Sequence, residues 1–199
     1  MQQDFVIREK PADMSFEVIR NVLQRAHKQN FDKGIVMTTP TLSAEQLEEK
    51  IGPDGKCFIA LKGDEVVGTA SFRIREINRW YHTGKTAEFI MDAIVPEYQG
   101  NHIFPMLEEA RINALKDIGI KTVRFDTAEK NRRRQKLALK NDFDYVDFVS
   151  FNANHYSVVM FRWLEKRPFP KAWCLFRYYR KKIHLKARFK PGMKKRFGI

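Results

Sequence analysis

Cysteine is scarce in this sequence, and long apolar runs are absent from it. Cys57 and Cys174 are the only cysteines among 199 residues, too few for a disulfide framework or a four-cysteine metal site. No stretch contains the roughly 20 apolar residues that a transmembrane helix needs, and residues 1–10 lack the apolar core of a secretion signal. We therefore expect a cytoplasmic protein with two reduced thiols.

Motifs for several common chemistries are also missing. The sequence has no G-x-x-x-x-G-K-[ST] phosphate loop, no H-E-x-x-H pair and no cysteine–histidine spacing typical of a metal site. We therefore expect no bound metal. With 43% hydrophobic and 31% charged residues, the composition excludes a disordered chain and is sufficient for one well-buried domain.

Acidic residues are absent from the C-terminal part of the chain. Residues 166–199 contain thirteen Lys or Arg and no Asp or Glu, so they account for the whole formal net charge of +13. We therefore expect a formally neutral domain over residues 1–165 and a basic, aromatic C-terminal extension over residues 166–199. Charge of one sign indicates an anionic partner for this extension.

Hydrophobic periodicity in the neutral part predicts alternating strands and helices. We expect strands near 5–7, 57–61, 65–72, 86–95, 121–126, 145–151 and 156–163, helices over 16–26, 43–50, 103–118 and 131–141, and loops over 31–42 and 76–85. Ser43 and Gln46 fit a capping box, and Gly119 fits a helix C-terminus. The helix over 103–118 has its apolar positions at Ile103, Leu107, Ala110, Ala114 and Ile118. This order implies an α/β fold with one mixed, mostly antiparallel central sheet flanked by helices.

Two segments carry the functional information. Residues 94–104, Ile-Val-Pro-Glu-Tyr-Gln-Gly-Asn-His-Ile-Phe, join a strand to an amphipathic helix. A helix N-terminus offers unpaired N–H groups to a phosphate, and glycine lets the backbone approach it closely. An ordinary strand–turn–helix connection would show the same order of elements. The second segment is residues 131–143, which begin with Asn131 and end with Phe143.

Both segments resemble those of the GCN5-related N-acetyltransferase (GNAT) superfamily, V-x-P-x-Y-R/Q-G-x-G-x-G/A followed later by N-x-x-A-x-x-L-Y-x-K-x-G-F. The resemblance covers roughly residues 4–163 and implies the fold class expected above. It implies acetyl-CoA as the acyl donor, with a strand that splays from its neighbour and pairs with the pantetheine arm. The residues that would bind acetyl-CoA are Ile94, Val95, Gln99, Gly100, Asn101, His102, Ile103, Phe104 and Asn131.

Four departures from the family pattern bear on cofactor binding and mechanism. His102 and Phe104 replace the two later glycines, and Asp142 replaces another glycine. Ala138 stands where many members carry a tyrosine that protonates the departing thiolate. The first hypothesis is an acetyl-CoA-dependent N-acetyltransferase that acts on a primary amine by direct transfer in a ternary complex. The alternative is a catalytically degenerate GNAT-fold module for binding or scaffolding.

The resemblance makes Glu88 the candidate general base, because some members use a glutamate on the strand before the turn. A carboxylate there would accept the ammonium proton directly or through water. Asp92, four residues later, is expected on the same strand face. For either acid, a structural hydrogen-bonding role is the alternative.

Other charged and aromatic groups near these segments have two interpretations each. Trp80, Tyr81 and His82 form an aromatic patch that suits stacking against a sugar ring or a hydrophobic acceptor, or simply fixes its own loop. Residues 132–134 are three arginines, which either neutralise a cofactor phosphate or form a solvated helix face.

The extension has a helical pattern over residues 171–189. Its stripe consists of Ala172, Phe176, Tyr179, Ile183 and Ala187. Such a helix suits an anionic membrane surface; single-stranded nucleic acid is a less favoured partner, and packing of the stripe on the domain is a further alternative. A membrane location suits an amine-bearing small molecule or glycan precursor as acceptor, such as an amino sugar of envelope glycan assembly, used at the inner face of the membrane.

Overall fold

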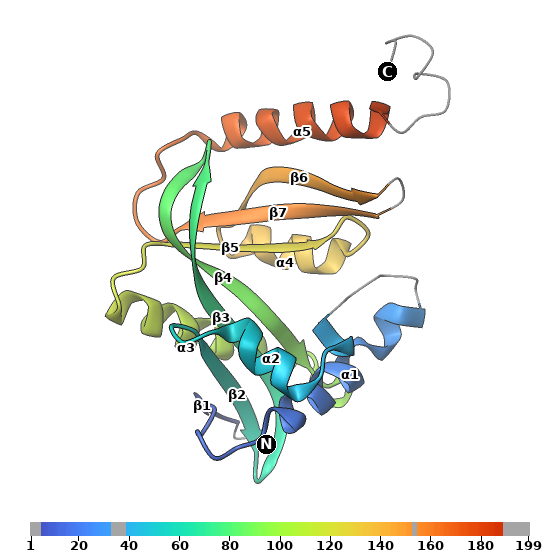
Figure 1. The fold of residues 1–199 in the computed structure, drawn as a ribbon, viewed down its shortest axis with the longest axis vertical. Helices are drawn as coiled ribbons and strands as arrows, with labels where there is room; N and C mark the ends of the chain where they lie inside the picture. Colours follow the sequence, from blue (N-terminus) through green and yellow to red (C-terminus); the bar gives the residue numbers. More distant parts are fainter. Residues whose placement is uncertain (1–4, 33–38, 153–154, 189–199) are drawn as a thin grey trace. The chain divides into compact units, whose positions relative to one another are not determined.

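The structure is a computed structural model that describes residues 5–32, 39–152 and 155–188. Its elements follow the predicted order (Figure 1). The strands are β1 (Val6–Glu9), β2 (Lys56–Lys62), β3 (Glu65–Arg79), β4 (His82–Ile94), β5 (Thr122–Ala128), β6 (Asp144–Asn152) and β7 (His155–Trp163). The α-helices are α1 (Phe16–Asp32), α2 (Ala44–Ile51), α3 (Ile103–Asp117), α4 (Arg132–Lys140) and α5 (Lys171–Arg188), with short 3₁₀ turns η1 (Thr39–Thr41) and η2 (Pro96–Tyr98).

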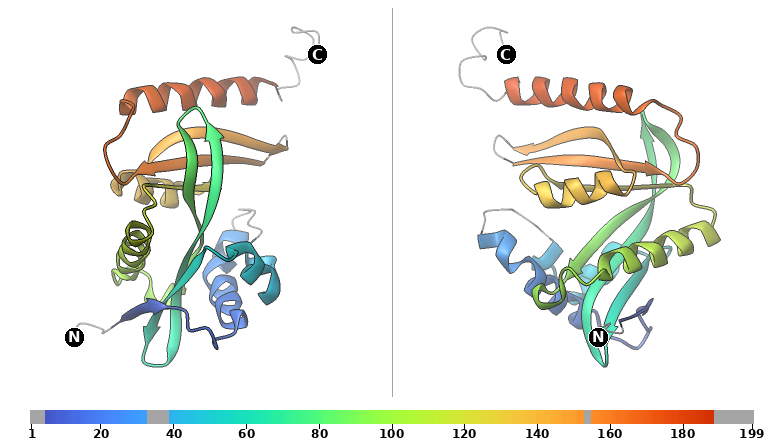
Figure 2. Two further views of the ribbon diagram at one scale, coloured as in Figure 1. Left: turned by 60° about the vertical axis from the view of Figure 1, so that its left-hand side comes forward. Right: turned by 180° about the vertical axis from the view of Figure 1, so that it is seen from behind.

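The chain forms two compact units, residues 1–121 and 122–199. In the first unit, β1, β2, β3 and β4 pair in this order, and every pairing is antiparallel. Helices α1 and α2 cover one face of this sheet, and α3 covers the other (Figure 2). Side chains of both helix layers and of the sheet form the core, among them Ile19, Leu23, Leu47, Ile59, Phe72, Leu107 and Leu115. The predicted class, mixed α/β with a mostly antiparallel sheet flanked by helices, is confirmed.

The β3–β4 hairpin is longer than predicted. The prediction of a loop over residues 76–85 is wrong. Strand β3 continues to Arg79, β4 begins at His82, and these two residues are paired. Only Trp80 and Tyr81 connect the strands. The outer part of this ribbon is largely exposed and mostly polar. Its Ile74 and Ile77 fall on opposite faces of β3, so the sequence lacks the alternation that identifies a half-buried strand.

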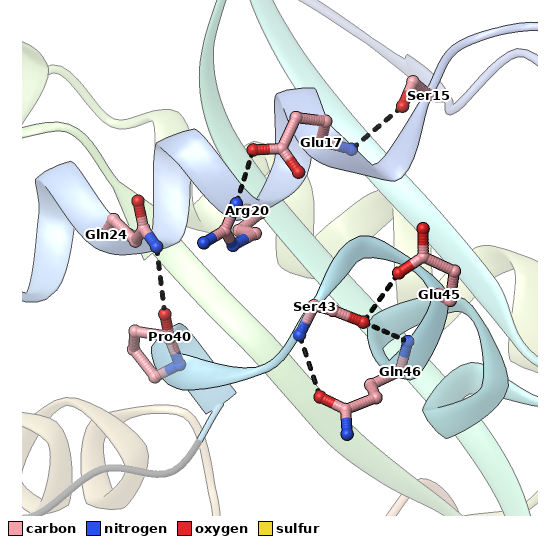
Figure 3. Close-up of polar contacts among 8 residues, drawn as sticks. All are labelled: Ser15, Glu17, Arg20, Gln24, Pro40, Ser43, Glu45 and Gln46. Atoms are coloured by element: carbon pink, nitrogen blue, oxygen red, sulfur yellow. Dashed lines mark hydrogen bonds and ion pairs between the residues drawn. The ribbon is translucent and has the colours of Figure 1, made fainter.

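The capping box predicted for α2 is present (Figure 3). The Ser43 hydroxyl accepts a hydrogen bond from the Gln46 backbone N–H at 3.3 Å, and the Gln46 side-chain oxygen accepts one from the Ser43 N–H at 2.9 Å. These two contacts satisfy backbone donors that the first turn of a helix leaves unpaired. They explain why α2, with only eight residues, begins at a defined position.

Helix α3 buries a face that differs in part from the predicted one. Ile103 and Leu107 are buried as expected, but Ile118 is 50% exposed and Arg111 is completely buried. The buried set is Ile103, Leu107, Glu108, Arg111, Ile112 and Leu115. Gly119 follows the helix in a left-handed conformation, φ 71°, as its predicted role at the C-terminus requires.

The second unit contains a three-stranded antiparallel sheet in the order β5-β7-β6 with the helices α4 and α5. Helix α5 lies along β6 (Figure 1) and buries Cys174 and Tyr178. Both cysteines of the chain are unpaired and buried. Among the described residues, no helix combines the length and the apolarity of a membrane span. Residues 189–199 of the predicted extension lie outside the described residues.

Candidate functional site

The turn between β4 and α3 contains most of the predicted cofactor residues. After Ile94 and Val95 the chain passes through η2, and the Gln99 side chain donates a hydrogen bond back to the Ile94 carbonyl at 3.1 Å. The Asn101 side chain donates to the Tyr98 carbonyl at 3.2 Å. These local bonds fix the path of the backbone between strand and helix.

Two residues of this turn adopt the left-handed region that favours glycine. Gly100 has φ 94° and His102 has φ 58°. A Cβ atom built on Gly100 would have no heavy atom within 4 Å, so one side of the backbone there is open to a ligand. The open side and the turn's exposed position are what close approach by a phosphate requires.

Helix α3 begins directly after this turn. His102 is its N-cap residue, and its side chain makes no capping hydrogen bond. Pro105 lacks an N–H, so among the first three helical residues only Ile103 and Phe104 are backbone donors. The partial positive charge of the helix N-terminus adds to them. The residues present therefore fit the pyrophosphate of a CoA ester, with one donor fewer than a helix without Pro105 would have.

A β-bulge interrupts β4 before the turn. Ser71 pairs with Ile90, but Thr69 pairs with Ala93, so β4 has one residue more than β3 between these pairs. Met91 has φ 57°, which accommodates the extra residue. A bulge changes the direction of the side chains that follow it.

The bulge overturns the expectation that Glu88 and Asp92 share a face. Glu88 contacts Arg73, which also donates to the Lys50 carbonyl of α2 at 3.5 Å. Asp92 instead accepts a hydrogen bond from Arg111 of α3, and α2 and α3 cover opposite faces of the sheet (Figure 2). The four-residue spacing assumes regular alternation, which the inserted residue breaks.

Glu88 lies on β4 with its side chain only 5% exposed. Its Oε2 atom accepts hydrogen bonds from Nε of Arg73 at 2.6 Å and from a guanidinium nitrogen of Arg75 at 3.3 Å. Both arginines lie on β3, so these contacts join β4 to β3 and give Glu88 the structural hydrogen-bonding role that the sequence left as the alternative.

Arg111 is completely buried, which hydrophobic periodicity does not predict. Besides Asp92, it donates to the Ser71 carbonyl at 3.1 Å, and its guanidinium lies 3.8 Å from the centre of the Phe89 ring. Arg111 follows Leu107 by four residues and so lies on the apolar stripe of α3. This spacing is the feature of the sequence that indicates its burial. Arg111 thus links α3 to both strands beside the bulge.

Asn131 lies in the second unit, at the start of α4. Its side-chain oxygen accepts a hydrogen bond from the Arg134 backbone N–H at 3.2 Å, so it is the N-cap of that helix. Ala138 is completely buried, and Asp142, at a glycine position of the family pattern, has φ 59°. Asp142 thus adopts a conformation that glycine would adopt without a steric penalty.

Tyr145 is the nearest tyrosine in sequence to Ala138. Its hydroxyl donates to the Gln135 side-chain oxygen at 3.2 Å, and its ring stacks on Tyr178 at 4.7 Å. Burial raises the pKa of Tyr145, and the charge of Arg132 partly opposes this. In this arrangement Tyr145 is a neutral hydrogen-bond donor.

The aromatic and arginine candidates have local partners. Trp80 and Tyr81 make an edge-to-face contact at 5.5 Å between ring centres, and Tyr81 is buried. His82 contacts the Lys85 carbonyl at 3.2 Å. Of the three arginines, Arg134 stacks over Phe125 at 4.2 Å. Within the described residues, no group of three or more His, Cys, Asp or Glu side chains gathers in a way that would hold a metal.

A sequence model of the acetyltransferase (GNAT) family matches residues 18–143. The chain belongs to the GNAT family. The match includes the turn at 94–104 and ends at Phe143, so both segments that carry the resemblance lie inside it. No curated protein matches the chain.

Solved structures of GNAT enzymes share the fold. The ribosomal-protein-S18-alanine N-acetyltransferase of Escherichia coli has a TM-score of 0.62 at 14% identity, with 82% of this chain and 96% of that chain covered. The PaiA N-acetyltransferase of Thermoplasma acidophilum, in complex with coenzyme A, has a TM-score of 0.62 at 19% identity, with coverages of 80% and 99%. An aminoglycoside 6′-N-acetyltransferase complexed with coenzyme A has a TM-score of 0.60 at 13% identity, with 82% of this chain and 99% of that chain covered.

Proposed function

We propose that this protein is an acetyl-CoA-dependent N-acetyltransferase that acts on a primary amine. The observation that carries the proposal is the turn from β4 to α3, where Gly100 leaves one side of a left-handed backbone open directly before a helix N-terminus. The family match over residues 18–143 supports the same conclusion. In the first unit, the acetyl-CoA residues of this proposal are Ile94, Val95, Gln99, Gly100, Asn101, His102, Ile103 and Phe104. Asn131, in the second unit, stays a prediction from the sequence.

The reaction requires no covalent enzyme intermediate. The neutral amine attacks the thioester carbonyl carbon, a C–N bond forms, and the C–S bond breaks with CoA thiolate as leaving group. The ammonium proton goes to Glu88 or to a water that Glu88 holds. The thiolate takes its proton from solvent, because Ala138 offers none, and a thiolate is a fair leaving group without a general acid.

For the acceptor we propose an amino sugar or another amine-bearing glycan precursor of envelope assembly. The chain shares its fold with an enzyme that acetylates aminoglycosides, which are amino sugars. We place the activity in the cytoplasm at the inner face of the membrane, because such precursors are carried on nucleotides or lipids.

A binding or scaffolding module without catalysis is the second candidate. Ala138 favours it, because a completely buried methyl group stands where many family members carry an acidic hydroxyl. Calorimetric titration with acetyl-CoA followed by an assay on a panel of amines separates the two. Binding without transfer to any amine would support the module.

The role of Glu88 is tested by Glu88→Gln, which preserves shape and removes proton affinity. We expect acetyl-CoA affinity to be retained and transfer to slow by roughly a hundredfold. The pH profile of kcat/KM should also lose the limb that reports deprotonation of a basic group. Arg75→Gln is the matched control, because it removes one ion pair of Glu88 but keeps the carboxylate. If both variants lose activity equally and have the same pH profile, Glu88 is structural.

A further inference from the structure

Helix α5 is fixed to the second unit by one face. Tyr178 stacks on Tyr145 of β6 at 4.7 Å and meets Phe148 edge to face at 5.9 Å. Lys181 pairs with Asp147 at 2.5 Å, and Lys182 pairs with Glu129 at 2.7 Å. Cys174 is 1% exposed beside them. These contacts involve the polar and aromatic side of the helix rather than its apolar stripe.

The opposite face of α5 is apolar and exposed. At 100° per residue, Phe176 and Ile183 lie about 180° around the helix from Cys174. They are 55% and 67% exposed, and Tyr179 and Trp173 beside them are 49% and 45% exposed. The alternative that this stripe packs on the domain is therefore wrong for the unit that holds α5. A contiguous apolar face of this kind marks an interaction site.

The charge around this face indicates what binds it. Residues 166–199 contain thirteen basic and no acidic residues. Ion pairs join five of these cations to Glu129, Asp142, Asp144 and Asp147. Residues 122–199 contain six Asp or Glu in all, too few to neutralise the thirteen cations, so a positive excess is left in this unit. Arg180 lies about 60° from Ile183 around the axis. Cations that flank an apolar stripe match an anionic lipid surface.

Other occupants fit these observations less well. A second copy of the chain would bring two segments without any acidic residue together, and like charges oppose that contact. Single-stranded nucleic acid stacks on aromatic rings, but Ile183, the most exposed of these side chains, offers no ring. Aliphatic and aromatic side chains mixed in one stripe are typical of the boundary between headgroups and acyl chains.

We infer that α5, while docked on β6 through Tyr178 and its lysines, binds an anionic lipid bilayer through Trp173, Phe176, Tyr179 and Ile183. The helix lies in the interface plane, with its apolar face among the upper acyl chains and its arginines at headgroup level. This surface needs no transferase activity, so it stands or falls separately from the proposed function.

The experiment measures co-sedimentation of the full chain with vesicles of phosphatidylcholine and phosphatidylglycerol, and with phosphatidylcholine alone. We expect binding to the mixed vesicles only, weakened but not abolished by high salt, because the apolar contact is not screened. The double variant Phe176→Ser, Ile183→Ser should reduce partitioning by at least about tenfold.

The matched control is the double variant Ile118→Ser, Leu139→Ser. These side chains are 50% and 42% exposed and lie outside α5, so the control changes general surface hydrophobicity without changing the stripe. It should bind vesicles like the unaltered chain. In the unaltered chain, Trp173 emission should also shift to shorter wavelength on vesicles, and Trp173→Phe should remove that shift.

Three results would overturn the inference. One is equal vesicle binding by the stripe variant and the control. Another is binding of a single-stranded oligonucleotide that the stripe variant loses, with no vesicle binding. The third is a dimer in solution that the stripe variant dissociates. Thermal unfolding of each variant shows whether a loss comes from failure to fold.

Discussion

Three residues other than glycine have positive φ among the described residues, namely Met91, His102 and Asp142. Two of them, His102 and Asp142, stand at positions where the family pattern has glycine. The left-handed conformation costs a residue with a Cβ roughly 1–2 kcal/mol. Both residues therefore adopt a backbone conformation that suits glycine, and the fold bears the strain.

This strain predicts the effect of His102→Gly. Relief of the left-handed penalty exceeds the added flexibility of the unfolded chain, so we expect the free energy of unfolding to rise by about 0.5 kcal/mol in urea denaturation. Asn101→Gly is the control, since Asn101 lacks a positive φ, and it should destabilise. A stability loss for His102→Gly would mean that the imidazole makes a stabilising contact.

Gly100→Val tests the proposed phosphate approach. Valine places a branched side chain on the open side of the turn, and we expect acetyl-CoA to bind at least tenfold more weakly, about 1.4 kcal/mol, by calorimetry. Gly63→Val is the matched control, because Gly63 also has a positive φ and open space around its Cβ position but lies in the β2–β3 turn. Equal affinity in the two variants would contradict the placement.

At the scale of elements, the sequence predicted most of the fold because local signals agreed. The capping box of Ser43 and Gln46 marked the start of α2, and Gly119 marked the end of α3. Hydrophobic periodicity indicated α1. The bulge at Met91 left no such signal, since one extra residue alters pairing without altering composition. Arg111 was missed because a charge on an apolar stripe is ordinarily a sign of exposure.

We predict that the docking of α5 on the second unit weakens at acidic pH. Burial alone would raise the pKa of Glu129, but hydrogen bonds from Lys182 and Lys186 outweigh it and hold that pKa below its ordinary 4.5. A lowered folded pKa means that the stabilisation is complete above pH 4.5 and is lost as pH falls through the folded value.

Glu129→Gln should therefore lower the free energy of unfolding by about 2 kcal/mol near neutral pH and by much less at about pH 3. Chemical denaturation of both chains at the two pH values measures this. A difference that stays constant with pH would show that the Glu129 charge does not hold the helix.

For the whole molecule, the packing of α5 bears on the boundary predicted at residue 165. Deletion of residues 166–199 removes Tyr178, whose burial is worth about 2–3 kcal/mol, and exposes its partners on β6. We expect the shortened chain to unfold at lower temperature in calorimetry. Deletion of residues 189–199 alone keeps α5 and should have little effect on this measure. Equal stability of all three chains would establish residues 1–165 as a self-sufficient domain.

The bulge in β4 has a consequence for how the chain tolerates changes in length. Loops usually accept gained or lost residues, whereas a strand accepts substitution more readily than a change in count. Loss of a single residue between Ile90 and Ala93 would restore regular alternation along β4. The side chains on one side of the deletion, either those around Glu88 or those next to the turn, would then point to the opposite face of the sheet. The spacing of Glu88 from Gly100 is therefore a constraint on evolution and on engineering, even where the residues between them are free to vary.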